Sequence, residues 1–306
     1  MSILSKNNCC TVLMYHRIRP RLSGGKRYPN TGLAVYLDEF EKQMAFLKKN
    51  CNVLSKNEFI ECVKNGFVFP KRSVLLTFDD GSTDIYEHAY PILKKHDIPA
   101  IVFIPTDFIG SNKVFWWEEL ELYLMDSPEA YIKEALYMVE LSDEEKVKYL
   151  KEVKAKYKVK GQNIGRSALT WEEIREMIGS GISFQPHTKT HIRLTNISDN
   201  EAEIEILGSK KAVEDNLGSK ADVFSYPHGG ISDFTNVHED ILKRNGFKLA
   251  FSTFEWEVRK GCDIYALPRL AVTSLDGFIM YRIKISEMPV LFKKILRKIH
   301  DKCVKP

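Results

Sequence analysis

The chain has 306 residues, of which 44% are hydrophobic and 28% are charged, with a formal net charge of +4. These values are typical of a soluble globular protein with one large domain or two small ones. No window has the roughly eighteen apolar residues of a membrane span, and the first ten residues lack the apolar core of a secretory signal. The six cysteines show no CxxC spacing, which favours reduced thiols, so we expect a cytoplasmic protein.

The positive charge is concentrated at the C-terminal end. Residues 289–306 contain six Lys or Arg against one Asp, a local charge of +5, so the preceding 288 residues sum to −1. This distribution argues against a nucleic-acid surface. Apolar residues of the tail recur at three- and four-residue spacing, at Leu291, Phe292, Ile295, Leu296, Ile299 and Cys303. They predict a basic amphipathic helix that either lies on an anionic membrane as a peripheral contact or packs on the rest of the protein.

Taken in chain order, short apolar runs and helical patterns alternate. The runs predict about seven strands, at 11–15, 74–78, 100–104, 182–185, 223–226, 248–252 and 267–272, together with a very short one at 52–54. Helical patterns lie between them, at 37–49, 55–65, 86–96, 170–178 and 200–216, with a further helix ending at 245–246. This alternation is typical of a parallel sheet and predicts one domain, close to a (β/α) barrel, over residues 1–288. Residues 17–32 read as a loop, and about 110–165 as a helical insertion.

Two adjacent carboxylates end the apolar run at 74–78. Asp79 and Asp80 are followed by Gly81. Neighbouring residues of a strand point to opposite faces, so both carboxylates can serve one pocket only where the pleat breaks. Gly81 permits such a break. The alternative is an ordinary Asp-Asp-Gly turn.

Two histidines follow the predicted strand at 182–185. His187 and His191 lie four residues apart, a spacing that places both on one face of a helical turn, where they can bind one ion. The alternative is a pair of capping or core-edge histidines. Both clusters follow strands, at the rim where such barrels hold their active sites. Two imidazoles and one carboxylate make a catalytic metal shell with open positions, and imidazole favours zinc or a similar transition metal.

These motifs resemble those of the polysaccharide deacetylases, carbohydrate esterase family 4. Thr77-Phe78-Asp79-Asp80-Gly81 matches that family's first motif, and His187-Thr188-x-x-His191 matches its second. The resemblance covers most of the chain, to about Val272. It implies a distorted (β/α) barrel in which Asp79 is the general base and Asp80, His187 and His191 hold the metal.

The later motifs depart from the family pattern. Ser225, in Phe224-Ser225-Tyr226-Pro227-His228-Gly229, replaces the arginine that usually orients the catalytic aspartate, and His228 replaces a tyrosine. No Asp-x-x-Asp-Trp motif is visible. Leu267-Pro268-Arg269 stands where the family has its acid histidine, so that histidine is missing; Arg269 is a candidate replacement for the lost arginine.

His16 is the predicted general acid. Met14-Tyr15-His16 ends the first strand and resembles a branch of the family in which a histidine there takes this role. The first and last strands of a closed barrel are neighbours, so the replacement is geometrically reasonable. The alternatives are a histidine satisfied in a loop, and His228 as the acid.

The sequence therefore predicts a metal-dependent N-deacetylase. We expect it to release acetate from an N-acetylated amino sugar in a glycan or a lipid-linked saccharide precursor. The alternatives are a saccharide-binding protein that has lost turnover and a ring-amide hydrolase of the same superfamily. Phe115-Trp116-Trp117 opens the insertion and either stacks on sugar rings or anchors the insertion; the anchor is the favoured interpretation.

Overall fold

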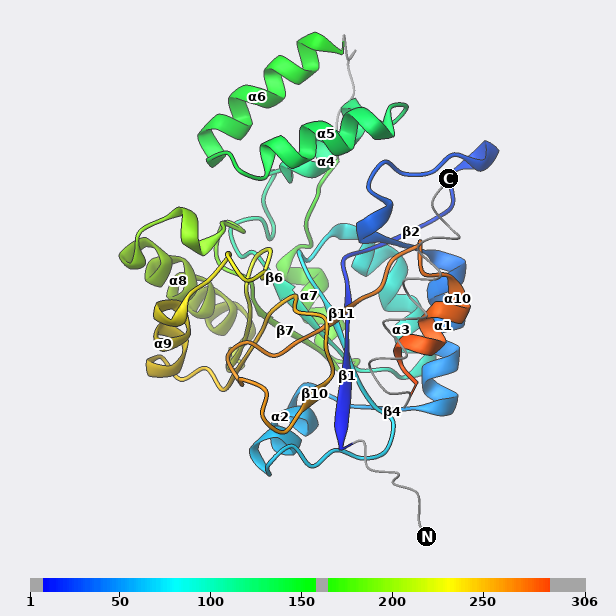
Figure 1. Cartoon of the computed structure of the whole chain (residues 1–306), viewed down its shortest axis with the longest axis vertical. Coiled ribbons are helices and arrows are strands. Elements are labelled where there is room, and N and C mark those ends of the chain that lie inside the picture. The colour runs from blue at the N-terminus through cyan, green and yellow to red at the C-terminus, as the bar shows by residue number, and fades with distance from the viewer. Residues whose placement is uncertain (1–7, 158–164, 287–306) are drawn as a thin grey trace.

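A mostly parallel sheet forms the centre of the protein (Figure 1). The structure is a computed structural model that describes residues 8–157 and 165–286. The sheet has the order β10-β1-β5-β6-β7, with β11 also paired to β1 and β4 to β5. Its strands are β1 (Cys9–Tyr15), β4 (Asn52–Val53), β5 (Ser73–Phe78), β6 (Ala100–Ile104), β7 (Ile182–Pro186), β10 (Val258–Arg259) and β11 (Leu270–Ala271). Only β10 pairs antiparallel within this sheet.

The remaining strands complete a distorted (β/α) barrel. β8 (Val223–Ser225) and β9 (Leu249–Phe251) form a separate parallel pair, and a bridge from Phe251 to Leu267 leads on toward β11. Among the described residues no backbone ladder joins β7 to β8. The side chain of Gln185 spans this seam, because its Oε1 accepts the backbone N–H groups of Asp222 and Val223, both at 3.0 Å. One side chain thus replaces a missing stretch of ladder.

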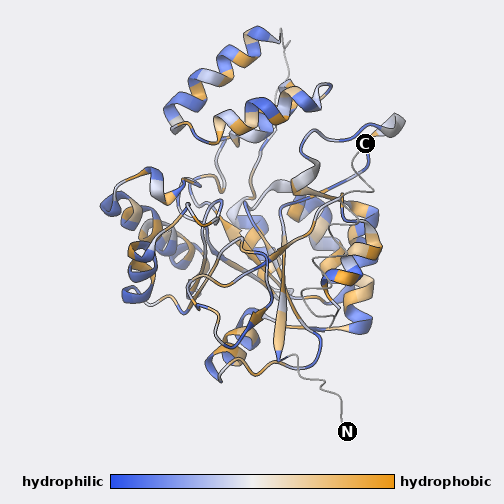
Figure 2. Cartoon of the chain, viewed as in Figure 1, coloured by the Kyte–Doolittle hydropathy of each residue, from blue (hydrophilic) through white to orange (hydrophobic). Residues whose placement is uncertain are grey.

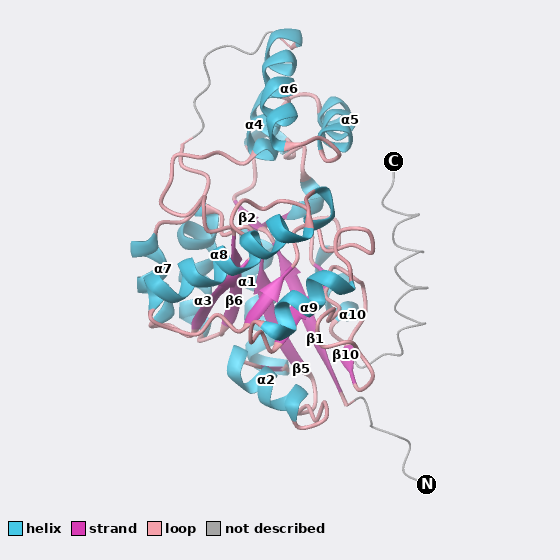
Figure 3. Cartoon of the chain, turned by 90° about the vertical axis from the view of Figure 1, so that its left-hand side faces the viewer, coloured by secondary structure: helices cyan, strands magenta, loops and turns pink. Residues whose placement is uncertain are grey.

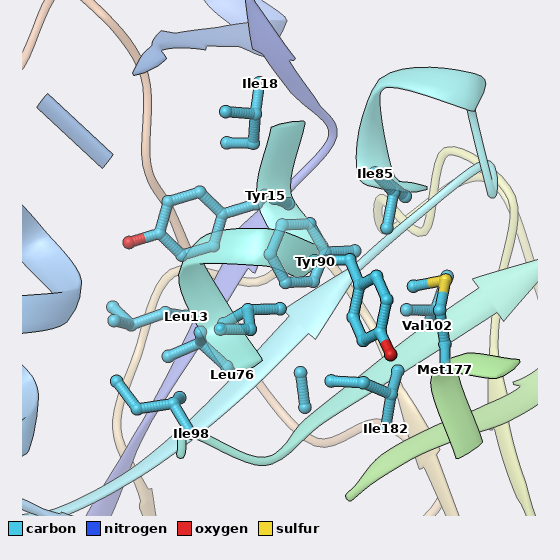
Figure 4. Packing of buried hydrophobic residues seen from close by; sticks show 14 of the residues in the cluster. Leu13, Tyr15, Ile18, Leu76, Ile85, Tyr90, Ile98, Val102, Met177 and Ile182 are labelled. Carbon is cyan, nitrogen blue, oxygen red and sulfur yellow. The ribbon is translucent and has the colours of Figure 1, made fainter. Parts of the chain in front are cut away.

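Helices cover the outside of the strands (Figures 1 and 3). They are α1 (Leu37–Asn50), α2 (Lys56–Lys64), α3 (Tyr90–His96), α7 (Trp171–Ile178), α8 (Asp199–Leu217), α9 (Asn236–Arg244) and α10 (Gly277–Lys284). The strands are hydrophobic almost throughout, whereas the helices mix hydrophobic and hydrophilic residues (Figure 2). Successive residues of β5 explain this: Leu76 packs in the cluster under the helices (Figure 4), and Leu75 packs in a second cluster on the other face. Both faces are therefore buried.

The insertion forms a small helical layer above the strand ends (Figures 1 and 3). Helices α4 (Trp116–Tyr123), α5 (Pro128–Met138) and α6 (Asp143–Lys156) pack around a cluster of their own. Part-buried ion pairs fasten the layer to the barrel: Arg17 contacts Glu118, and Arg19 contacts Glu121 at 2.6 Å. Phe115 is 1% exposed and stacks on Phe108 in the main core, as expected for an anchor.

Three local predictions have different outcomes in the structure. The predicted loop at 17–32 begins with strand β2 (Arg17–Arg19), which pairs with β3 (Ala34–Tyr36). The helix predicted at 86–96 is confirmed, with the irregularity that Pro91 implies: a π-helical turn over Ile85–Ala89 leads directly into α3, which begins next to Pro91. The predicted helix at 289–306 lies outside the described residues. Within those residues, none of the helices is both long enough and apolar enough to cross a bilayer.

Candidate active site

The chain breaks out of the strand conformation directly after β5. Asp80 has φ +70° and Gly81 has φ +62°, so two successive residues are left-handed. An added Cβ on Gly81 would lie 2.7 Å from Cγ2 of Ile104, which excludes larger residues there. For Asp80 this conformation costs about 1–3 kcal/mol, and such strain is concentrated at functional sites. After this break both carboxylates lie near the same two histidines, since the charges of His16 and His187 lower the pKa of Asp79 and of Asp80.

Asp80, His187 and His191 form a cluster that fits a metal ion. One ligand atom from each residue lies within 4.8 Å of the others. Oδ1 of Asp80 is 3.1 Å from Nε2 of His191 and 3.9 Å from Nε2 of His187. A tetrahedral ion with ligands at about 2.1 Å separates its ligand atoms by about 3.4 Å. The donor set of two imidazoles and one carboxylate leaves a coordination position open, as catalytic zinc sites do.

His187 is prepared to bind a cation through one nitrogen. Its Nδ1 lies 2.6 Å from the backbone carbonyl of Ser225 and must donate to it, which leaves Nε2 as the ligand atom. Burial is the main reason that the pKa of His187 falls to about 4, so the imidazole is neutral at neutral pH. Burial raises the pKa of Asp80, but its hydrogen bond and Coulombic attraction to His191 outweigh this, so the pKa lies well below its ordinary value. Both groups are therefore in the protonation state that a metal requires.

Arg269 holds Asp79 with a bidentate ion pair. Its Nη1 and Nη2 each donate to one carboxylate oxygen of Asp79 at 2.7 Å. The other contacts of the guanidinium are the hydroxyls of Ser225 (2.9 Å) and Thr77 (3.3 Å) and the carbonyl of Ser252 (2.9 Å). Arg269 is 0% exposed, and these contacts use all five of its N–H groups. The guanidinium therefore occupies the position beside Asp79 that the sequence assigned to it as a candidate.

This ion pair also sets the protonation of Asp79. Burial alone would raise the pKa of the carboxyl. The charges of Arg269, His187 and His16 lower this pKa by more than burial raises it. The net pKa lies below the ordinary value. Asp79 is thus ionised at neutral pH and can accept a proton.

His16 lies beside the two carboxylates. Tyr15 of β1 pairs with Phe78 of β5, and the N–H of Asp79 donates to the carbonyl of Tyr15 at 2.9 Å. The next residue on each strand is therefore His16 on one side and Asp79 on the other. The charge of His16 also lowers the pKa of Asp80, which places it within electrostatic reach of the metal cluster.

His228 is less suited to act as an acid. Its ring centroid is 5.4 Å from that of His191, so it too borders the cluster. Burial, reinforced by the positive charges of His191, Arg193 and Lys146, lowers its pKa to about 3. A general acid must carry its proton at the working pH, and His228 does not.

Comparison with known proteins gives the family. The sequence profile described as polysaccharide deacetylase matches residues 68–250, more than half of the chain. This chain belongs to the polysaccharide deacetylase family. It is a hydrolase that acts on amide bonds, as expected from its motifs.

Two staphylococcal proteins of the same name are similar to this chain in sequence. The poly-beta-1,6-N-acetyl-D-glucosamine N-deacetylase of Staphylococcus epidermidis is 27% identical over 292 residues, covering 89% of this chain and 82% of that protein. The protein of that name from Staphylococcus aureus strain N315 is 28% identical over 295 residues, covering 89% and 81%.

Solved structures confirm the fold. IcaB from Ammonifex degensii superimposes with a TM-score of 0.64 at 22% identity, covering 91% of this chain and 97% of that one. The Streptococcus pyogenes deacetylase PplD, in complex with acetate, gives a TM-score of 0.62 at 24% identity, covering 87% and 93%. The distorted (β/α) barrel predicted from the sequence is therefore confirmed.

In this deacetylase the segment from His187 to His191 is a loop, so the prediction of a helical turn is wrong. Thr188 (φ +61°) and His191 (φ +62°) are left-handed, and the Thr188 hydroxyl accepts the N–H of His191 at 3.0 Å. The loop conformation, and not helical periodicity, turns both imidazoles toward Asp80.

Glu205 of α8 holds this loop from outside, a contact that no sequence motif indicates. Its Oε2 accepts the N–H groups of Lys189 at 2.8 Å and Thr190 at 2.9 Å, and its Oε1 accepts the Thr190 hydroxyl at 3.2 Å. One turn later, an added Cβ on Gly208 would lie 2.5 Å from Cδ of Lys189. This face of α8 is therefore shaped to seat the loop.

We expect Glu205→Ala to weaken metal binding by about 10–100-fold, because residues that orient metal ligands have effects of this size. Glu205→Gln keeps an acceptor oxygen and should lose less. Titration of the apoprotein with Zn²⁺ measures this. Glu203→Ala is the matched control, since Glu203 lies on the same helix but pairs with Arg244. Unchanged affinity in Glu205→Ala would show that the loop holds its shape without this contact.

Proposed function

We propose that this deacetylase is a metal-dependent enzyme that releases acetate from N-acetylated glucosamine residues of a glycan or of a lipid-linked precursor. The observation that carries the proposal is the juxtaposition of two units: a three-residue metal cluster, and an ionised Asp79 held next to it by Arg269. The names of the staphylococcal relatives support the choice of sugar.

The residues divide the reaction between them. Asp80, His187 and His191 would hold the ion, which when bound polarises the acetyl carbonyl and makes water more acidic. Asp79 takes a proton from the attacking water as its oxygen bonds to the carbonyl carbon. His16 gives a proton to the amide nitrogen as the C–N bond breaks. The C–N bond breaks to give acetic acid and a free amine, which ionise at neutral pH to acetate and an ammonium group, and the proton taken by Asp79 balances the one given by His16.

The alternative of an inactive saccharide-binding protein rested partly on the missing arginine of the third motif. Arg269, the residue directly before β11, supplies a guanidinium to Asp79, which removes that reason. The names of the staphylococcal relatives, N-deacetylases of an amino-sugar polymer, favour a sugar substrate over the ring-amide alternative.

The test is acetate release from a panel of N-acetylated saccharides, including β-1,6-linked N-acetylglucosamine oligomers and lipid-linked and nucleotide-linked N-acetyl sugars. Activity should disappear with a chelator and return with Zn²⁺, the metal that imidazole ligands favour. Absence of release from every member by the metal-loaded protein would overturn the proposed function.

His16→Ala should keep the metal and lower amide hydrolysis by about 10²–10⁴-fold, the usual contribution of a general acid. An activated ester such as 4-nitrophenyl acetate should lose much less, because its leaving group needs no proton. The comparison of kcat on the two substrates checks this. His228→Ala is the matched variant, and the acid role passes to His228 if only that variant is impaired on the amide.

The sequence-based expectation of a cytoplasmic protein at an anionic membrane surface is a further part of the proposal. It rests on the charge pattern of residues 289–306. Liposome co-sedimentation should show binding that requires anionic lipid, weakens with salt and disappears on truncation before Pro289. Equal behaviour of the intact and truncated chains would contradict it.

A further inference from the structure

A buried network of charged side chains begins at the residue after His16. Arg17 is the first residue of β2, and its guanidinium contacts two carboxylates. Its Nε lies 2.5 Å from Oδ2 of Asp84, and its Nη1 contacts Glu118. The side chains of Arg17, Asp84 and Glu118 are only 13%, 6% and 8% exposed. The catalytic scheme above uses none of these three residues.

The network joins segments that are far apart in the sequence. Asp84 belongs to the segment after β5, and the hydroxyl of Ser82 donates to its second oxygen at 2.6 Å. Glu118 lies on α4 of the insertion, and its second oxygen accepts the hydroxyl of Ser167 at 2.5 Å. The carbonyl of Ser167 in turn accepts the N–H of Thr83 at 3.0 Å. Both ends of the insertion are therefore tied to the segment after β5 and, through Glu118, to Arg17.

Attachment of the insertion alone does not explain this network. Buried ion pairs lose hydration energy that their attraction only partly returns, and apolar side chains of similar size often stabilise a fold equally well. The insertion also has other attachments, the buried Phe115 and the ion pair of Glu121 with Arg19 at 2.6 Å. What a guanidinium adds is direction, because its planar N–H groups donate along fixed lines. Two such contacts hold Arg17, and with it the peptide bond to His16, in one place.

We propose that Glu118 is a positioning residue for the general acid, and that it acts through Arg17 to hold His16 where it can give its proton to the leaving nitrogen. The inference rests on the proposed function and adds to it that the helical insertion supplies part of the catalytic geometry. Proton transfer requires the donor within hydrogen-bond reach of the acceptor, so a small displacement of His16 slows cleavage of the C–N bond. The metal cluster and the ion pair of Asp79 stay intact under such a displacement.

Glu118→Ala tests the proposal on two substrates. We expect kcat to fall by about 10–100-fold on a β-1,6-linked N-acetylglucosamine oligomer, the effect of a misplaced catalytic group, and to change much less on 4-nitrophenyl acetate, whose leaving group needs no proton. Glu118→Gln keeps an acceptor oxygen for Arg17 and should recover most of the loss. Glu121→Ala is the matched control, since Glu121 lies one turn later on α4 and pairs with Arg19. Its effect should be equal on the two substrates.

A double variant separates positioning from damage to the fold. His16→Ala has no acid left to position, so the addition of Glu118→Ala should lower its amide kcat no further. An equal loss in both backgrounds, or equal losses on the amide and the ester, would overturn the proposal. Should Glu118→Ala be unfolded at the assay temperature, Ser167→Ala replaces it, because it removes the hydroxyl that holds Glu118. A smaller loss confined to the amide supports the proposal in that variant, and its absence overturns it.

Failure of the proposed function is recognised separately, as a wild type that releases no acetate from any of the oligomers. Crystal structures of the metal-loaded variants then decide about the positioning. The imidazole of His16 should be displaced by about 1 Å or more in Glu118→Ala, enough to disturb catalysis, and should keep its place in Glu121→Ala. An imidazole in the wild-type position in both variants would overturn the proposal.

Discussion

Asp79→Asn is expected to keep its metal and to lower kcat for deacetylation by about 10²–10⁴-fold, the usual contribution of a general base. The asparagine retains the shape of the side chain but cannot accept a proton from water. Metal content by atomic spectroscopy and acetate release from an N-acetylglucosamine oligomer measure the two effects. The substitution also leaves Arg269 without its anion, so thermal unfolding must show that the variant is folded at the assay temperature.

The three predicted ligands behave differently under the same hypothesis. Asp80→Ala, His187→Ala and His191→Ala should each lose bound metal together with activity, because two ligands hold an ion poorly. Added Zn²⁺ at high concentration should restore part of the activity in these variants and none in Asp79→Asn. Equal metal loss in all four variants would show that the roles of base and ligand are assigned wrongly.

The short-range features of the site could be predicted from the sequence because they lie in continuous segments. The apolar run of β5 followed by Asp79, Asp80 and Gly81 indicates a strand that ends in a sharp break. The break needs only a residue that tolerates a positive φ, and Gly81 signals it. The alternation of strands and helices likewise indicates a parallel sheet whose strand ends meet at one rim.

The contacts between residues far apart in the sequence could not be predicted in this way. Arg269 and Asp79 are 190 positions apart, and only the pairing of β11 and β5 with opposite edges of β1 brings them together. Glu205 and Gln185 act on backbone N–H groups, which every non-proline residue offers, so no residue pattern marks their partners. At His187 the sequence pattern was misleading. The four-residue spacing of His187 and His191 suggests a helix, but the left-handed residues Thr188 and His191 form a loop that turns both imidazoles toward Asp80.

Arg269→Met is expected to destabilise the protein by about 3–5 kcal/mol, because it leaves the buried carboxylate of Asp79 without a partner. Arg269→Lys should recover only part of this, since an ammonium group cannot form the bidentate pair. Urea unfolding at pH 7 measures both. The double variant Arg269→Met/Asp79→Asn should lose less free energy of unfolding than the two single variants lose together. Removal of both charges also removes the penalty of a buried charge without a partner. Strict additivity would show that the ion pair contributes nothing of its own.

The same substitution should move the pH profile of the enzyme in a defined direction. The pKa of Asp79 in the folded protein lies below its ordinary value, because the charge of Arg269 and its neighbours outweighs the effect of burial. The pair therefore stabilises the fold above the unfolded pKa of about 3.9, and this stabilisation is lost as the pH falls through the folded value. In Arg269→Met burial acts with less opposition, and the pKa of Asp79 rises. A base works only when ionised, so the acidic limb of kcat against pH should shift to higher pH, while a purely structural loss would lower kcat equally at every pH. An unshifted limb would mean that Arg269 holds the fold together without tuning Asp79.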